Sequence, residues 1–439
     1  MLTRLQARNF KRFDFIDVEL GNPVVFVGPN NSGKTTALQA LALWDLGVRR
    51  WHEKRGETET PAKRPGVVIN RRDFFAAAIP EANLLWRDLH VRDVRKDNGK
   101  QSTTNIRIDV SVWGVANGKE WQCGLEFDYA NAESFHCRPL RLADGKDPDR
   151  LPVPAEAKDV RVAFLPPMSG LADREFAKQP GEVGFLIGQG RTAEVLRNLC
   201  NQVYGIDGSE EWEQVRSQIM KLFGIQLNDP ELRARNAEIV MSYRERGVDL
   251  DLSCAGRGVQ QTLLLLTYMA ANPGAVLLLD EPDAHLEILR QREVYELVSN
   301  EAVTRNSQIV IASHSEVILN EAADRDVVIA FVGAPHRIDD RGSQVLKSLK
   351  EIGFEHYYQA EQRGWVLYVE GSNDLEILRG FARLLGHPAA APLEAPFVQY
   401  IGNQAPKARD HFYGLREAKP DLSGFLLCDR LEKPLQENN

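Results

Sequence analysis

The sequence predicts an α/β protein with a mostly parallel, covered sheet and a separate antiparallel flap. Strands and helices alternate in the central part of the chain, which is typical of a parallel sheet buried on both faces. From Thr104 to Leu140 the apolar period becomes two, and an Asn117-Gly118 turn separates two such runs, which predicts a β-hairpin followed by a strand near Phe135. The predicted parallel strands are residues 160–165, 275–281, 308–314 and 327–331.

The N-terminal region predicts two strands that precede the strand, loop and helix of a glycine-rich motif. Residues 2–10 and 13–20 alternate apolar and polar positions, as strands with one buried face do. An apolar strand and a glycine-rich loop precede a helix predicted over Lys34–Leu46. Residues 47–66 are polar, basic and without periodicity, so we interpret them as a solvated loop rather than a nucleic-acid contact.

The glycine-rich loop in VVFVGPNNSGKTT (residues 24–36) fits the pattern of a phosphate-binding loop. Gly28 and Gly33 permit the backbone angles at which N–H groups surround phosphate oxygens, and the following helix directs its positive end at the anion. Lys34 has the reach for the β- and γ-phosphates, and Thr35 carries a hydroxyl suited to Mg²⁺. The alternative is a plain glycine turn between a strand and a helix. The predicted nucleotide-binding residues here are Asn30, Asn31, Ser32, Gly33, Lys34, Thr35 and Thr36.

Two carboxylates and a histidine follow apolar strands farther along the chain. Asp280 and Glu281 end the run AVLLLDE, and His314 ends the run QIVIASH. Behind a phosphate loop, an aspartate can hold Mg²⁺ and an adjacent glutamate can polarise water, while a histidine can sense the γ-phosphate. The alternatives are ordinary strand-end acids and a structural histidine.

Small residues precede a predicted helix at residues 250–261, LDLSCAGRGVQQ. Ser253, Gly256 and Gly258 offer free N–H groups near a helix start, which suits an anion. One subunit has no second phosphate for them, so they fit a nucleotide held by another copy. The alternative is a glycine-rich turn before a core helix.

In this order the motifs resemble the head of ATP-binding-cassette ATPases, specifically the SMC/RecF-like branch, and the opening NFKRF of residues 9–13 resembles its first strands. The resemblance implies that Lys34 and Thr35 belong to the Walker A motif, Asp280 and Glu281 to Walker B with the catalytic glutamate, residues 282–285 to the D-loop, and His314 to the switch. It further implies ATP and Mg²⁺ as cofactors and a homodimer or higher homo-oligomer through the heads. The signature departs from LSGGQ, and Gln189 is only a candidate for the Q-loop.

The C-terminal region resembles the start of a Toprim domain. In VEGSNDLE, Glu370 and Asp374 flank Gly371 at a strand end, and Asp429 in LLCDRLE matches the first acid of the family's D-x-D pair, whose second position is Leu431 here. The resemblance implies that Glu370, Asp374 and Asp429 hold Mg²⁺ or Mn²⁺. A Rossmann-like domain with surface acids is the alternative. We expect an ATPase domain at 1–340, a connector at 341–362 and an incomplete Toprim-like domain at 363–439.

An ATP-binding-cassette head followed by Toprim is the layout of the OLD (overcoming lysogenization defect) family. The resemblance implies an ATPase of bacterial DNA processing or anti-phage defence, in which ATP-dependent dimerisation controls a Toprim nuclease, with DNA as partner. The alternative is an ATPase sensor or scaffold with an inert Toprim remnant that regulates a separate effector protein. A transporter ATPase subunit is disfavoured by the C-terminal region.

The composition agrees with a cytoplasmic protein that does not enter a membrane. The formal net charge of −8 argues against nucleic-acid binding over the whole surface and leaves room for a local patch. Five cysteines without a C-x-x-C pair indicate reduced thiols. The apolar region at residues 259–279 is interrupted by Asn272-Pro273-Gly274 and is therefore not a membrane span.

Overall fold

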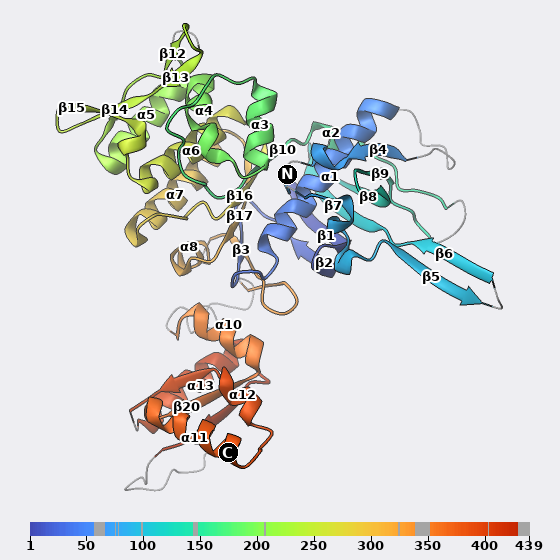
Figure 1. Cartoon of the computed structure of the whole chain (residues 1–439), viewed down its shortest axis with the longest axis vertical. Helices are drawn as coiled ribbons and strands as arrows, with labels where there is room; N and C mark the ends of the chain where they lie inside the picture. Colours follow the sequence, from blue (N-terminus) through green and yellow to red (C-terminus); the bar gives the residue numbers. More distant parts are fainter. Residues whose placement is uncertain are drawn as a thin grey trace. The chain divides into compact units, whose positions relative to one another are not determined.

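The computed structural model of the chain forms two compact units, which are described separately (Figure 1). Unit 1 is residues 1–331 with 335–337, and unit 2 is residues 338–439 with 332–334. The predicted domain boundaries at residues 340 and 362 stay predictions, and residues 341–351 of the predicted connector lie outside the described residues. The structure describes residues 1–56, 66–74, 76–77, 79–97, 100–143, 148–205, 208–323, 325–338, 352–402 and 404–428.

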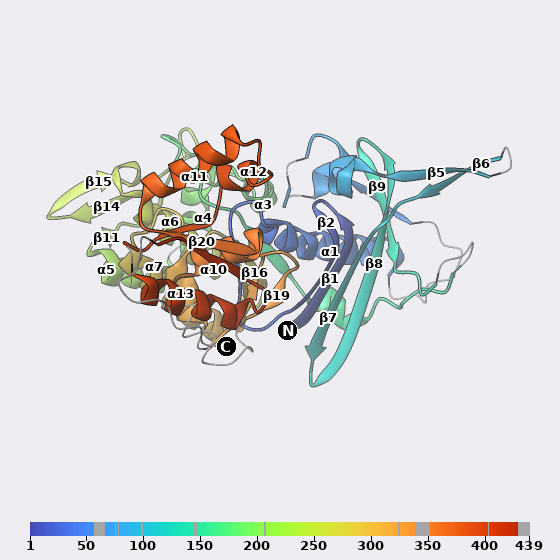
Figure 2. The ribbon, with the colours of Figure 1, turned by 90° about the horizontal axis from the view of Figure 1, so that it is seen from below.

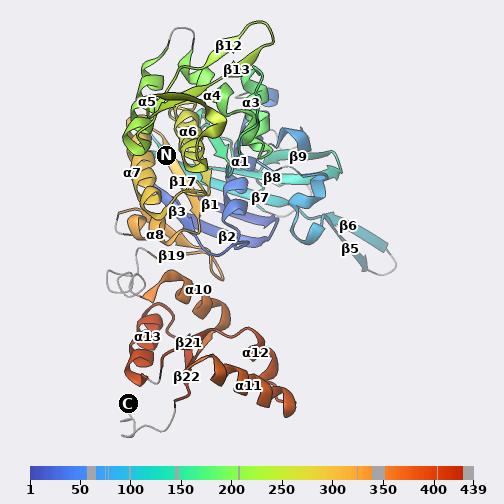
Figure 3. The same cartoon turned by 60° about the vertical axis from the view of Figure 1, so that its left-hand side comes forward.

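The first sheet of unit 1 is the predicted antiparallel flap. Its strand order is β2-β1-β7-β8-β9-β4. The hairpin turn at Asn117-Gly118 joins β7 to β8, with Ala116 paired to Lys119. Away from this sheet, β5 and β6 form a two-stranded ribbon that the sequence pattern did not predict (Figure 3). The strands are β1 Leu2–Phe10, β2 Phe13–Glu19, β4 Val67–Asn70, β5 Arg92–Asp97, β6 Lys100–Asn105, β7 Ile108–Ala116, β8 Lys119–Asn131 and β9 Ser134–Pro139.

The second sheet is parallel except for its last strand. Its order is β10-β16-β17-β3-β18-β19, and β19 runs antiparallel to β18. All residues of β3, β16 and β17 are buried, as their continuous apolar sequences indicate. The mixed α/β fold class is therefore confirmed. The strands are β3 Val24–Val27, β10 Val162–Leu165, β16 Val276–Asp280, β17 Gln308–Ser313, β18 Val327–Ala330 and β19 His336–Arg337.

Helix α1, Lys34–Arg55, lies between the two sheets (Figure 2). The prediction that residue 47 begins a loop is wrong for residues 47–55, because α1 continues through them. Val48 and Trp51 are 1% and 3% exposed, and Gly47 packs so closely that a Cβ would stand 2.6 Å from Leu125. Burial of these residues on one face of the helix stabilises its last turns. Residues 57–65 lie outside the described part of the chain.

The opposite face of the parallel sheet is covered by α7 and α8 (Figure 3). The remaining helices of unit 1 form a group around α6, with short strands beside it. None of the helices in the described parts of the chain is both long and apolar enough to cross a membrane. These helices are α2 Ala155–Asp159, α3 Pro180–Gly188, α4 Leu196–Tyr204, α5 Glu210–Phe223, α6 Arg257–Ala271, α7 Ile288–Thr304 and α8 Glu316–Ala322; the short strands are β11 Gln226–Leu227, β12 Glu231–Arg233, β13 Glu238–Val240, β14 Ser242–Glu245 and β15 Val248–Asp251.

Unit 2 is built on a three-stranded parallel sheet of order β21-β20-β22. Leu367, Val369 and Leu375 form its small apolar core, and all residues of β22 are exposed. The strand expected before Glu370 is present as β20, and β21 and β22 flank it. The elements are α10 Phe354–Arg363, β20 Trp365–Val369, α11 Ser372–Leu384, α12 Ala390–Glu394, β21 Val398–Tyr400, α13 Ala405–Ala418 and β22 Ser423–Leu426.

Candidate ATP site

The phosphate loop connects β3 to α1, as its sequence predicts. Gly28 and Gly33 have φ angles of 155° and 110°, a region that residues with a Cβ rarely adopt. A Cβ at Gly28 would stand 2.8 Å from the Phe331 carbonyl oxygen, and one at Gly33 would stand 2.8 Å from the ring of Phe13. The two glycines are therefore required by the space around them as well as by their backbone angles.

Lys34 is held inside this loop. Its ammonium group donates to the carbonyl oxygens of Gly28 at 2.7 Å and Pro29 at 3.0 Å. Burial lowers the pKa of Lys34, while the carboxylates of Glu281 and Asp280 oppose that change. The side chain is 5% exposed. Lys34 is thus a preorganised cation whose two carbonyl contacts can be exchanged for phosphate oxygens.

Thr35, the residue after this lysine, contacts Asp280, which lies 245 positions farther along the chain. The Thr35 hydroxyl donates to both carboxylate oxygens of Asp280, at 3.0 and 2.9 Å. Burial raises the pKa of Asp280 to about 6, against a hydrogen bond from Thr35 that lowers it. A buried carboxylate and a hydroxyl are oxygen ligands of the kind Mg²⁺ prefers, so the residues present fit this ion. A bound Mg²⁺ would supply charge stabilisation at phosphate oxygens.

Glu281 and His314 lie at the ends of β16 and β17. His314 Nδ1 is 3.4 Å from Glu281 Oε1, and the Glu281 N–H donates to the Ala312 carbonyl at 2.8 Å. Glu281 has a φ of 49°, an uncommon angle for a non-glycine residue that is frequent at functional sites. The arrangement holds a carboxylate and an imidazole together at the carboxyl edge of the sheet, where they can orient a water molecule.

Three buried polar atoms near this edge have no hydrogen-bond partner among the described residues. They are the Ser32 hydroxyl oxygen in the phosphate loop, one carboxylate oxygen of Asp283, and the amide oxygen of Gln261, whose amide nitrogen donates to the Pro282 carbonyl. Burial also raises the pKa of Asp283. Such atoms can be satisfied by water or by a polar ligand. Ser32 was a predicted nucleotide contact, whereas Asp283 was not a candidate, because its burial depends on the packing of β17 and α7.

Of the three predicted signature residues, Gly258 lies beside the D-loop. A Cβ at Gly258 would stand 3.5 Å from the His285 carbonyl oxygen, whereas one at Gly256 would meet no atom within 4 Å. Ser253 and Gly256 are exposed, and Gly256 caps the start of α6. Among the described residues, no hydrogen bond joins Ser253, Gly256 or Gly258 to the phosphate loop. The candidate Q-loop residue Gln189 ends α3, and it too has no hydrogen bond to the site there.

The acidic residues of unit 2 are not gathered in the same way. Glu370 is exposed after β20, and Asp374 accepts a hydrogen bond from the Gly371 N–H at 2.8 Å, which caps α11. No group of three metal-ligating side chains occurs in the described parts of the chain. The predicted metal ligand Asp429 lies outside the described residues, so the three-acid site stays a prediction.

The chain is similar in sequence to a known nuclease. Over 375 residues the chain is 51% identical to the OLD nuclease of Thermus scotoductus, covering 76% of this chain and 64% of that protein. The predicted resemblance to the OLD family is confirmed. The chain spans less than two thirds of this OLD relative. Residues 202–320 also match the family described as "AAA domain, putative AbiEii toxin, Type IV TA system".

Solved structures of SMC heads are similar to the chain at low sequence identity. The SMC head domain of Thermotoga maritima has a TM-score of 0.38 at 16% identity and covers 77% of this chain and 98% of its own. A head with an extended coiled coil bound to the C-terminal domain of ScpA from Pyrococcus furiosus has a TM-score of 0.43 at 12% identity, covering 80% and 99%.

Proposed function

We propose that this OLD-like chain binds and hydrolyses ATP with Mg²⁺, and that hydrolysis requires two copies of the head. The observation that carries the proposal is the convergence of Lys34, Thr35, Asp280, Glu281 and His314 at one sheet edge, with Thr35 hydrogen-bonded to Asp280. Catalysis of phosphoryl transfer depends mainly on such positioning and on electrostatic stabilisation.

The need for a second copy is supported by the surface next to this edge. Ser253 and Gly256 are exposed, so their polar groups are accessible to a nucleotide held by another subunit. Ile288 and Leu289, at the start of α7 just after the D-loop, are 70% and 79% exposed. Apolar side chains exposed beside polar catalytic groups favour a protein contact there. Closure of a second head would cover both the apolar pair and the nucleotide.

The test is ATP turnover by the Lys34→Ala variant. We expect phosphate release to fall by about 100-fold or more, because a buried cation at the β- and γ-phosphates is lost. Lys221→Ala, which removes an exposed lysine from α5, serves as the matched control and should keep wild-type turnover. Undiminished hydrolysis in the Lys34 variant would remove the phosphate loop from the reaction.

We further propose that the head controls a metal-dependent DNA endonuclease in the Toprim-like region, in bacterial DNA processing or anti-phage defence. The 51% identity to an OLD nuclease supports this assignment. The second candidate, an ATPase that regulates a separate effector, is favoured by one observation: the Asp374 carboxylate is engaged in capping its own helix. Nicking of plasmid DNA with Mg²⁺ or Mn²⁺ separates the two. Nicking that Glu370→Ala abolishes supports the nuclease, and absence of nicking by the wild type supports the regulator.

A further inference from the structure

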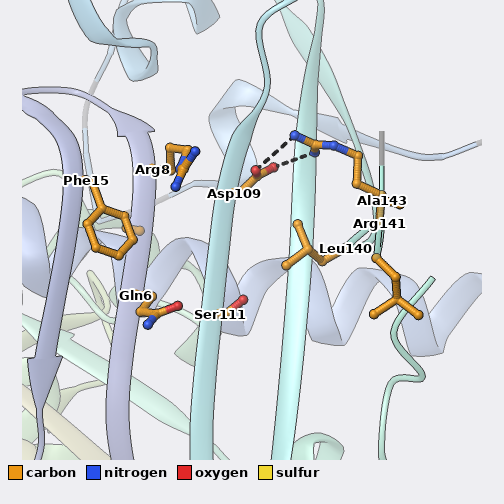
Figure 4. Close-up of a pocket in the computed structure, with 10 residues that line it drawn as sticks. Gln6, Arg8, Phe15, Asp109, Ser111, Leu140, Arg141 and Ala143 are labelled. Carbon is orange, nitrogen blue, oxygen red and sulfur yellow. Dashed lines mark hydrogen bonds and ion pairs between the residues drawn. The ribbon is translucent and has the colours of Figure 1, made fainter. Parts of the chain in front are cut away.

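The outer face of the antiparallel sheet carries a hollow of about 380 Å³ that lies outside the ATP site. Side chains alternate across a strand, so Gln6 and Arg8 of β1 point to this face while Leu5 points into the core. Phe15 of β2 and Ser111 of β7 line the same hollow (Figure 4). Its volume is within the range of sites that hold a small molecule.

Arg8 is the cation of this hollow. Its guanidinium carbon lies 5.4 Å from the centre of the Phe15 ring, and Arg8 makes no ion pair within the described parts of the chain. The carboxylate that shares the hollow, Asp109, instead accepts two hydrogen bonds from Arg141, at 2.9 and 3.2 Å (Figure 4). Although Asp109 attracts Arg8 through space, the direct ion pair of Asp109 is with Arg141, so no ion pair in the described part of the chain keeps the Arg8 guanidinium from contacting an anion.

The rest of the hollow suits a flat, partly apolar group. One wall of the hollow is the apolar ring of Phe15, a residue that is 49% exposed. Leu140 and Ala143 lie across the sheet from it (Figure 4). Between these apolar walls, Gln6 supplies an amide oxygen, since its amide nitrogen donates to Asp17 at 2.8 Å, and Ser111 supplies a hydroxyl. A planar ring can stack on phenylalanine, and an arginine beside it can hold a phosphate.

We propose that this hollow binds a nucleotide, with its base against Phe15 and its phosphate on Arg8. The nucleotide is either one unit of a single-stranded nucleic acid or a free mononucleotide. A duplex does not fit this chemistry, because its bases are stacked inside. The site is separate from the phosphate loop, so it goes beyond the proposed ATPase.

A second hollow on the same face offers another aromatic surface within reach of a strand, although Glu19 and Glu120 also line it and leave it without net positive charge. It has a volume of about 240 Å³ and contains Arg4, whose guanidinium carbon lies 5.2 Å from the Trp113 ring centre. Arg4 and Arg8 are four residues apart on β1, which separates them by about 13 Å. Arg4 is already paired with Asp17, so this hollow offers an aromatic stacking surface more than a free charge.

The experiment measures binding of fluorescein-labelled (dT)12 by anisotropy and of dTMP by calorimetry, using the full chain without ATP. Arg8→Glu and Phe15→Ala should each weaken (dT)12 binding by about tenfold or more, given the size of base–aromatic stacking and phosphate contacts. Arg8→Gln, a milder change, should weaken it by about fivefold. ATP hydrolysis by these variants should stay within about twofold of wild type, which separates this site from the proposed function.

Two matched controls test whether the effect belongs to the hollow. Arg174→Glu makes the same charge change at another exposed arginine, and Phe176→Ala removes a phenylalanine that is 47% exposed. Both should bind (dT)12 within about twofold of wild type. Binding of dTMP as tight as that of (dT)12, and lost in Arg8→Glu, supports the site with a free nucleotide as its source. The proposal is overturned if wild type binds neither ligand at 1 mM (an order-of-magnitude limit on useful affinity), or if the hollow variants and the controls behave alike.

Discussion

The candidate ATP site of unit 1 and the acidic residues of unit 2 are built in opposite ways. In unit 1, Thr35 and Asp280 come from distant parts of the sequence and bond to each other inside the fold. In unit 2, Glu370 and Asp374 are four residues apart, and Asp374 bonds only to the neighbouring Gly371 N–H in the hydrogen bonds recorded for the described residues. A long-range contact between polar groups needs the whole fold to maintain it, whereas a helix cap is a local device. The polar side chains of unit 1 are therefore already held in place for a ligand, whereas those of unit 2 are not.

Replacing Asp280 tests the long-range side of this comparison and should have the largest effect. Asp280→Asn removes a charged Mg²⁺ ligand, so we expect ATP hydrolysis to fall by about 100-fold or more. Because burial raises the pKa of Asp280 to about 6, the wild-type carboxyl gains a proton as the pH falls through 6 and then loses its affinity for Mg²⁺. The Mg²⁺ concentration for half-maximal hydrolysis should therefore rise about tenfold per pH unit below 6.

The measurement is a Mg²⁺ titration of phosphate release at pH 5, 6 and 7.5. Saturating Mg²⁺ should shift the acidic limb to lower pH, since the ion favours the charged carboxylate. A Mg²⁺ requirement that does not change between pH 5 and 7.5 would contradict the role given to Asp280.

The stability of unit 2 should depend on the protonation of a half-buried histidine. His411 hydrogen-bonds Tyr368 at 2.8 Å and His356 at 3.0 Å, and burial with the nearby charges of His356 and Lys407 lowers the pKa of His411 to about 4. In the unfolded chain the pKa is about 6.5. Protonation therefore favours unfolding, and stability is lost as the pH falls from 6.5 towards 4. The full shift corresponds to about 3 kcal/mol, and solvent screening of this half-buried group reduces the expected loss to about 1–2 kcal/mol.

Thermal unfolding of the full chain followed at pH 7.5, 6 and 4.5 checks this expectation. The His411→Gln variant keeps a polar side chain without a titrating ring. The temperature at which unit 2 unfolds should therefore change less with pH in this variant than in the wild type. An equal pH dependence in the variant and the wild type would show that another group is responsible.

Replacing Asp374 tests the helix cap of unit 2 and should have the smallest effect. Asp374→Ala removes the acceptor for the Gly371 N–H and should destabilise unit 2 by about 1 kcal/mol, the usual value of a helix cap. Asp374→Asn keeps an acceptor oxygen and is the matched control for structure. If Asp374 is also a metal ligand, both variants should lose any nicking activity, whereas a purely structural role predicts nicking by the Asn variant.

The sequence predicted those features of the fold that follow from short-range pattern. The phosphate loop, the buried runs that became β3, β16 and β17, and the hairpin at Asn117-Gly118 all have a local signature. The end of α1 was missed because the spacing of Trp44, Val48 and Trp51 is interrupted by charged residues and is stabilised by packing between two sheets. The polar ribbon of β5 and β6 has no apolar period to predict it.

The site was predictable in its residue types and less so in its contacts. Lys34, Asp280 and Glu281 are recognisable because each follows a strand in a fixed motif. The burial of Asp283, the packing of Phe13 on Gly33 and the pairing of Asp109 with Arg141 depend on contacts between distant segments. Such contacts leave no trace in the order of residues along one chain.

The central claim is that a single head is incomplete and that ATP becomes reactive when a second copy covers it. The direct measurement is the mass in solution of the Glu281→Gln variant. This variant should bind ATP and hydrolyse it at least about 100-fold more slowly than the wild type. The account predicts that addition of ATP with Mg²⁺ doubles the mass that the variant has without nucleotide, while Lys34→Ala keeps its nucleotide-free mass. A wild-type protein that remains a monomer with ATP and hydrolyses it at a rate per molecule independent of dilution would contradict the account.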